Sequence, residues 1–518
     1  FLDHQEIIVG FSKLYSVITC KLYECNDVFN QFYLRLEQFE GNDLRNTFIV
    51  LNLMISIVEE FNKSEKFNLI FFNKELSRIM KFSIDVLIKI YSQDLFDCVS
   101  DSLILVSLKL MDQCFSYQTI TYVKHSNYKE DEIKIFTVNV PIDFSEVIEN
   151  PQFIYLLFQY YYKMPKLRYL CLDILFKLAS TNHSCFINYF KNNSIQIIYK
   201  YFIDNLCNIF QNQMFEETEI HLLCIISYKI QIYFTMETKL MENIKKYYSF
   251  IDLFYQFTLN ILSIDFLLSN PQSVFYSILF WTRFLDSFFQ IPSVKIRNHI
   301  HDLIVQICMK YFNLIIIGFT EYFQDVYLFF TKDDRYFYEQ FRYVSILSEI
   351  DFQYFTNYFL STIDTFKQQY ISTYSYKDEI KLSIVIQIIV FMLISNQSTK
   401  FPDLIEQEIS LFLTLYKLIQ EPIIDINYYK SMHQENNLFF EEEIITFCFN
   451  FSSTVFGVDS FKSREHYLKI RKSQSNFNEL DFSVASKQIF QRIILSLKTF
   501  DNSPVLIHKI VHLLEIVN

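Results

Sequence analysis

Residues 273–317 read SVFYSILFWTRFLDSFFQIPSVKIRNHIHDLIVQICMKYFNLIII, and this stretch decides the fold of the chain. Its first part contains Trp281, the only tryptophan in 518 residues, and repeats apolar side chains every three or four positions, the period of a buried helix face. The repeating side chains are Val274, Ile278, Trp281, Leu285 and Phe288. Gln290, Ile291 and Pro292 then stop the helix. A second stripe with the same period follows, made of Ile300, Leu303, Ile304, Ile307, Cys308 and Tyr311. The stretch therefore predicts a helical hairpin.

Apolar rows are left over on both helices of this hairpin, including Phe275, Leu279 and Phe289 on the first and Ile315 on the second. Such a unit needs a similar hairpin on each side to bury them. The composition agrees, because 51% hydrophobic residues with only 4 Gly and 8 Pro can fill a large core but supply few turns for short strands. We predict an all-α fold, an α-solenoid of HEAT/armadillo-like helical hairpins with roughly ten to twelve units of about 40–47 residues.

The chain in order supports one array with a single irregular insertion. Residues 1–116 are predicted to form HEAT-like helical repeats, 117–150 an inter-repeat insertion, and 151–518 helical repeats that continue the same solenoid. Residues 133–140 of the insertion alternate in a way that indicates a short extended segment. Further on, Phe153–Leu178 reads as the cleanest repeat, with a turn at Met164 and Pro165. No linker rich in Pro, Gly or Ser divides the chain into separate domains.

Charge and hydropathy disfavour two classes of partner. The formal net charge of −12 disfavours a phosphate-binding surface, so we expect no direct contact with nucleic acid. The most hydrophobic run, Ile384–Ile394, is about half the roughly 20 residues that a membrane span needs and contains Gln387, which favours a buried helix and no membrane insertion. The ten cysteines include no CxxC pair, and several lie in apolar helical rows as reduced core residues. These are Cys98, Cys114, Cys171, Cys224 and Cys308.

Motifs that carry enzyme chemistry are missing from the sequence. It contains no GxGxxG, GxxxxGK[ST], GxSxG or HExxH. His508 and His512 are four apart, a spacing that can hold a metal ion, but no third ligand is near them in the sequence. We therefore expect a protein that is not an enzyme, with no catalytic, cofactor-binding or metal-binding residues.

Several positions around the opening stretch resemble a motif of a known family. They are Pro271, Ser273, Val274, Tyr276, Ile278, Leu279, Trp281, Arg283, Pro292 and Val294. This pattern is similar to one in exportin-7 and its close Ran-binding relatives, members of the importin-β (karyopherin-β) superfamily of nuclear transport receptors. Similar positions follow in the same order from about Cys20 to the end of the chain, among them Val138, Val140 and Pro141 in the insertion. Because the first residue is Phe1 rather than Met, we expect the middle portion of such a receptor.

The resemblance implies an exportin-like nuclear transport receptor. Such a receptor binds Ran in its GTP form together with protein cargo, passes the pore through contacts with Phe-Gly nucleoporins, and shuttles between nucleus and cytoplasm. The alternative is a HEAT-repeat scaffold or adaptor outside transport, because the same core pattern would serve either protein.

The acidic connection from Asp325 to Glu339 is the predicted partner-binding segment. It carries Asp325, Asp333, Asp334 and Glu339, and the resembling family has an acidic connecting segment in the same region. A basic GTPase surface would be complementary to it. An ordinary solvated loop would have the same composition.

Overall fold

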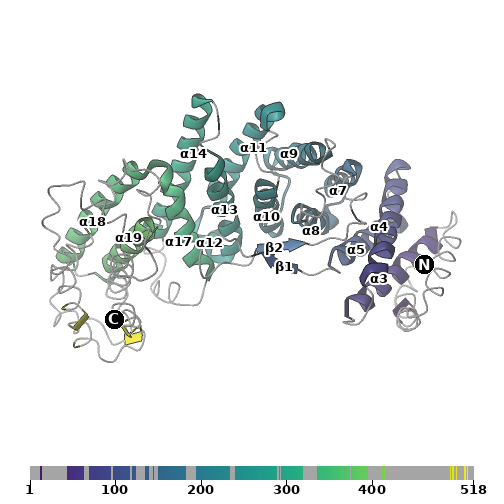
Figure 1. The fold of residues 1–518 in the computed structure, drawn as a ribbon, viewed down its shortest axis with the longest axis horizontal. Helices are drawn as coiled ribbons and strands as arrows, with labels where there is room; N and C mark the ends of the chain where they lie inside the picture. The colour runs from purple at the N-terminus through teal and green to yellow at the C-terminus, as the bar shows by residue number, and fades with distance from the viewer. Residues whose placement is uncertain are drawn as a thin grey trace. The chain divides into compact units, whose positions relative to one another are not determined.

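The computed structural model describes most of residues 44–394 (Figure 1). The described ranges are 44–63, 69–94, 97–116, 120–123, 135–138, 150–181, 194–233, 240–288, 293–318, 335–373 and 375–394, with isolated positions such as Phe144 and Ile291. Within them the chain is helical except for short turns and one pair of strands, which confirms the predicted all-α class there. Residue contacts group the chain into two compact units, Phe1–Phe254 and Tyr255–Asn518, and the boundary falls inside a helix.

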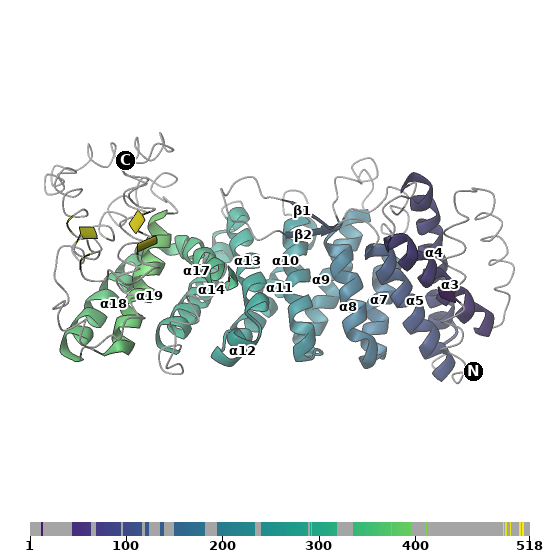
Figure 2. The ribbon, with the colours of Figure 1, turned by 90° about the horizontal axis from the view of Figure 1, so that it is seen from below.

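The first unit consists of consecutive helices. They are α3 (Leu44–Lys63), α4 (Leu69–Ser92), α5 (Cys98–Ser116), α7 (Pro151–Lys163), the 3-10 turn η3 (Pro165–Leu167), α8 (Arg168–Ala179), α9 (Ser194–Asn212), α10 (Glu217–Tyr233) and most of α11 (Leu240–Ile261). Helices α3, α5, α8 and α10 pack one on the next and form one layer. Helices α4, α7 and α9 form a second layer in the same way. Figure 1 shows the two rows within this unit, and Figure 2 shows its helices side by side. Each hairpin thus covers the apolar face of its neighbour.

The predicted insertion holds a small antiparallel sheet of β1 (Ile120–Val123) and β2 (Ile135–Val138). Strand β2 lies inside the extended segment expected at 133–140, whereas β1 was not predicted. The backbone N–H of Val138 donates to the carbonyl of Ser180 at the end of α8, 3.0 Å away. Phe144 is buried against Phe115 of α5, with ring centroids 6.3 Å apart. The insertion is therefore attached to the helices on both sides of it.

The second unit begins within α11 and contains the hairpin from which the fold was predicted. Its elements are α12 (Ile264–Ser269), α13 (Pro271–Phe288), α14 (Val294–Asn313), the π-helical turn η5 (Leu314–Gly318), α17 (Arg335–Leu347), the 3-10 turn η6 (Ser348–Asp351), α18 (Phe352–Thr373) and α19 (Tyr376–Ile394). Helix α13 packs on α17 and α17 on α19, while α18 packs on α19 and α14 contacts η6. Phe275, from the apolar row of α13 that the predicted hairpin left over, packs against Tyr343 of α17 with the ring centroids 5.9 Å apart.

Trp281 occupies the core of this unit and is fully buried. Its indole N–H donates to the Thr258 hydroxyl of α11 at 3.0 Å, and Thr258 pairs in turn with the Ser277 hydroxyl at 3.0 Å. Helix α13 ends at Phe288, next to the predicted stop, and the N–H of Ile291 donates to the Phe288 carbonyl. A tryptophan, two hydroxyl side chains and the neighbouring helix thus form one buried hydrogen-bonded group.

Among the described residues, one stretch, 294–318, is long and apolar enough to cross a membrane, and half of its apolar 18-residue segment is buried inside the structure. The core helices of soluble proteins can have the same length and composition, so this stretch is weak evidence for a membrane span. The predicted buried run Ile384–Ile394 lies in α19, where Ile384, Ile388 and Met392 are almost fully buried.

Candidate functional site

The predicted acidic segment is largely outside the described residues, since Asp325, Asp333 and Asp334 fall in the range 319–334. Glu339 is described, and it does not lie in a connection. It is inside α17, only 2% exposed, and its carboxylate lies 3.5 Å from the guanidinium of Arg342 one turn later. Helix α17 begins at Arg335 because the apolar stripe that includes Phe337 and Phe341 already requires helical spacing there. The expectation that Glu339 offers a surface carboxylate to a partner is therefore wrong.

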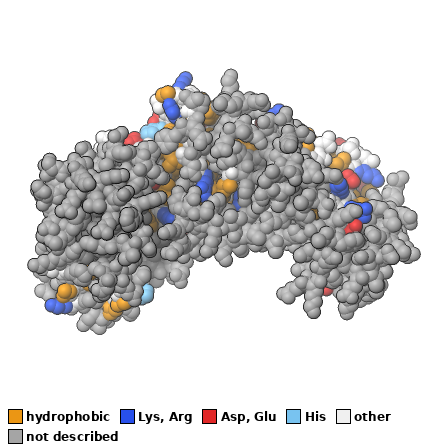
Figure 3. Space-filling model, viewed as in Figure 1, with side chains coloured by type: hydrophobic (Ala, Val, Ile, Leu, Met, Phe, Trp, Pro, Cys, Tyr) orange, Lys and Arg blue, Asp and Glu red, His pale blue; other side chains and the backbone are white. Residues whose placement is uncertain are grey.

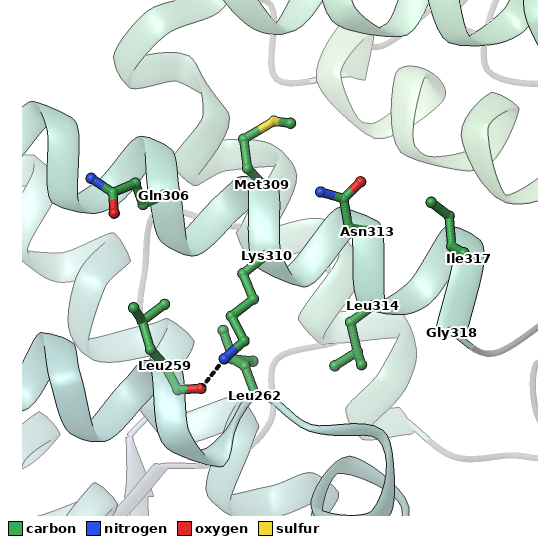
Figure 4. A pocket seen from close by; sticks show the side chains of 9 residues that line it. All are labelled: Leu259, Leu262, Gln306, Met309, Lys310, Asn313, Leu314, Ile317 and Gly318. Carbon is green, nitrogen blue, oxygen red and sulfur yellow. Dashed lines mark hydrogen bonds between the residues drawn. The ribbon is translucent and has the colours of Figure 1, made fainter.

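A slot on the outer side of α14 is the best candidate site among the described residues (Figure 4). It has a volume of about 620 Å³ and lies entirely within the second unit. Its walls come from the end of α11 and from α14 with η5, namely Leu259, Leu262, Gln306, Met309, Lys310, Asn313, Leu314, Ile317 and Gly318. The slot is open to solvent on one side, which suits part of a larger partner better than an enclosed small molecule.

Helix α14 packs one face into the core and lines the slot with the opposite face. The predicted stripe that includes Ile304, Ile307 and Tyr311 is buried toward the core. Gln306, Lys310, Asn313 and Ile317 repeat at three and four residues on the opposite face. The helix then continues as the π-helical turn η5, a distortion frequent at functional sites. Ile317 of this turn is 44% exposed, so an apolar side chain is held at the mouth of the slot.

Three polar side chains of α14 line the slot: Gln306, Lys310 and Asn313. Each is held in place by one hydrogen bond. The Tyr255 hydroxyl of α11 donates to Gln306 Oε1 at 2.5 Å, and the Tyr358 hydroxyl of α18 donates to Asn313 Oδ1 at 3.1 Å. The Lys310 ammonium donates to the Leu259 carbonyl, drawn as a dashed line in Figure 4. Burial raises the pKa of the Tyr255 and Tyr358 hydroxyls, so both stay protonated donors.

The consequence is a slot whose polar side chains offer donors. The oxygens of the Gln306 and Asn313 amides already accept a hydrogen bond, which leaves their NH₂ groups for a ligand. Lys310 has three N–H donors and no acceptor, and its bond to Leu259 uses one donor. The arrangement can bind oxygen acceptors beside an apolar group.

Other titratable clusters in the described residues serve the packing of helices. Asp112 of α5 and Asp173 of α8 both pair with the Lys177 ammonium, 3.1 Å from Asp173. Burial, followed by a hydrogen bond with Asp112, raises the pKa of Asp173 to about 6. His301 of α14 lies 3.3 Å from the carboxylates of both Asp302 and Asp351. Nowhere in the described part of the chain do three or more His, Cys, Asp or Glu side chains gather so that they could hold a metal ion.

Charge on the surface is mixed where it is described. The visible side chains in Figure 3 include hydrophobic, basic, acidic and histidine groups that are interspersed on that face. Four cysteines that the sequence placed in the core are buried as free thiols: Cys114, Cys171, Cys224 and Cys308. Burial raises the pKa of each of these thiols, which makes them poor nucleophiles.

Sequence reasoning missed the slot. Its polar members are ordinary surface residues in composition, and only their spacing opposite the apolar stripe of α14 signals a second face. A comparison with protein-family models found no match, and neither did a comparison with curated proteins.

Proposed function

We propose that this chain is part of an exportin-like nuclear transport receptor of the karyopherin-β superfamily, built as a HEAT/armadillo-type solenoid. The observation that supports the proposal most is the packing of successive helices in two layers within the first unit, each hairpin covering the next. Proteins with this construction present long helical surfaces and bind other proteins over them. Its proposed partners are Ran in its GTP form, protein cargo and Phe-Gly nucleoporins, encountered as it shuttles between nucleus and cytoplasm.

The proposed mechanism is conformational and not enzymatic. Small rotations between neighbouring hairpins change the curvature of a solenoid, so a partner that fits one curvature shifts the population toward it. Val274, Ile278 and Trp281, three of the α13 positions that resemble the exportin motif, are buried. They support the packing and leave partner recognition to outward-facing positions.

The deciding experiment is a titration of the 518-residue chain against Ran loaded with a non-hydrolysable GTP analogue or with GDP. A strong preference for the GTP form would support the transport receptor. Equal binding to both forms, or none, would overturn it in favour of the alternative, a HEAT-repeat scaffold or adaptor.

A variant of the acidic connection tests where Ran would bind. Replacing Asp325, Asp333 and Asp334 together by Asn should weaken binding of GTP-loaded Ran, most strongly at low salt, because the aspartates would face a basic GTPase surface. Glu339→Gln is the contrasting variant. Since Glu339 is buried against Arg342, its replacement should lower the stability of the second unit and leave the salt dependence of Ran binding unchanged.

A further inference from the structure

We propose that the slot formed by the end of α11 and the outer face of α14 binds a short extended peptide in which an aromatic side chain stands next to an aspartate or glutamate. The assignment rests on the shape of the slot, its apolar wall and its donor groups. It names a ligand class for this site and does not depend on a role in nuclear transport.

The apolar wall selects the aromatic side chain. Leu259 and Leu262 line the slot from the end of α11, and Leu314 and Ile317 line it from η5. Ile317 is 44% exposed at the mouth, so a bound ring would cover apolar surface that now faces water. A volume of about 620 Å³ has room for a phenylalanine or tyrosine side chain with the backbone that carries it.

The polar groups select an extended peptide with oxygen acceptors. Gln306, Lys310 and Asn313 lie along one face of α14, and the seven helical steps from Gln306 to Asn313 span about 10 Å. Three residues of extended chain cover about the same length. The free amide NH₂ groups of Gln306 and Asn313 can donate to backbone carbonyls of such a segment. A single small ligand would not use donors at both ends.

Lys310 supplies the preference for a carboxylate. It is the one charged side chain among the residues that line the slot. Its bond to the Leu259 carbonyl holds the ammonium at the apolar wall, with two further N–H donors available. An acidic residue next to the aromatic ring would therefore meet a positive charge, whereas a basic residue would be repelled.

The test is fluorescence polarisation of the 518-residue chain with short fluorescein-labelled peptides built on a Gly-Ser background. One peptide carries Phe followed by Asp, a second carries Phe followed by Asn, and a third carries Ala followed by Asp. The Phe-Asp peptide should bind more tightly than the other two. Lys310→Met should weaken its binding by about fivefold at low salt, the loss expected for a partly exposed ion pair. Lys310→Arg should restore most of the affinity.

Lys295→Met is the matched control, because Lys295 is an exposed lysine of the same helix outside the slot. It removes the same charge and should leave binding unchanged. Thermal melts of the variants check that each one folds. The proposal is overturned if the Phe-Asn or Ala-Asp peptide binds as tightly as the Phe-Asp peptide. It is also overturned if Lys310→Met and Lys295→Met weaken binding equally, or if a neutral Phe-Gly peptide binds as well with no effect of Lys310.

Discussion

Replacing Thr258 by valine should destabilise the second unit, because the hydroxyl accepts the hydrogen bond of the only tryptophan. Valine keeps nearly the same shape, so the change removes an acceptor without opening a cavity. The Trp281 indole N–H is fully buried and 3.0 Å from the Thr258 oxygen, and the Ser277 hydroxyl shares that oxygen. Losing the acceptor of a buried donor costs about 1–3 kcal/mol. We expect Thr258→Val to lower the free energy of unfolding of this unit by that amount.

Urea and thermal unfolding followed by tryptophan fluorescence measure this effect directly. Trp281 is the sole tryptophan and lies in the second unit, so its emission reports the unfolding of that unit. A loss of 1 kcal/mol should lower the melting temperature by about 2–4 °C for a unit of this size. Thr365→Val is the control, because Thr365 is an exposed threonine of α18 whose hydroxyl bonds only locally, to the Ser361 carbonyl. It should change stability by no more than about 0.5 kcal/mol.

A double-mutant cycle separates the hydrogen bond from packing. Trp281→Phe removes the N–H and part of the ring, and circular dichroism then follows unfolding in all four proteins. Replacing Trp281 should cost less in the Thr258→Val background than in the wild type, with a coupling energy of about 1 kcal/mol or more. The reasoning is refuted if the two substitutions are additive, or if Thr258→Val behaves like Thr365→Val.

Three further predictions concern the first unit. Because the Asp173 carboxyl binds a proton more tightly in the folded than in the unfolded chain, the stability it contributes is complete below the ordinary pKa of 3.8 and is lost as the pH rises through about 6. Asp173→Asn should reduce the pH dependence of the urea midpoint over this window and raise the free energy of unfolding at neutral pH by about 1 kcal/mol. A urea midpoint that varies with pH as in the wild type would count against this. Phe144→Ala should lower the free energy of unfolding by about 3–5 kcal/mol and speed limited proteolysis between α5 and α7, because Phe144 is buried against Phe115. An unchanged cleavage rate would contradict its anchoring role. Among the described thiols, half-buried Cys207 should react with iodoacetamide first, as measured by peptide mass spectrometry. Burial raises the pKa of the Cys171 thiol, so labelling of Cys171 before Cys207 would argue against the packing of α8.

Helix positions were predictable from the sequence where an apolar stripe has one clear face. The repeat expected at Phe153–Leu178 appears as α7 and α8, with η3 beginning at the predicted Pro165. There the side chain of Asn150 accepts a hydrogen bond from the N–H of Gln152, and a proline occupies the first turn of α7. Local signals and packing agree at this repeat, so the sequence pattern is sufficient.

Elements set by tertiary contact or by one competing side chain were not predictable. Strand β1 has only four residues and gains its hydrogen bonds from β2, so the sequence around Ile120 carries little signal of its own. Glu339 was assigned to a connection because charge suggests exposure, yet Arg342 one turn later neutralises it within α17. At the end of α11, the Ser263 side chain accepts from the N–H of Phe266 and starts a new helix, where the apolar pattern alone would run on.

The candidate site shows why function is harder to predict from sequence than fold in this chain. The inward face of α14 is constrained by volume, so its apolar residues stand out at helical spacing. The outward face is constrained only by what binds it, and Gln306, Lys310 and Asn313 become a donor surface through Tyr255, Tyr358 and the Leu259 carbonyl. All three partners are more than 40 positions away in the sequence from the residue that they bond. A substitution at Tyr358 should therefore alter recognition at Asn313 without touching the slot, which no reading of α14 alone would reveal.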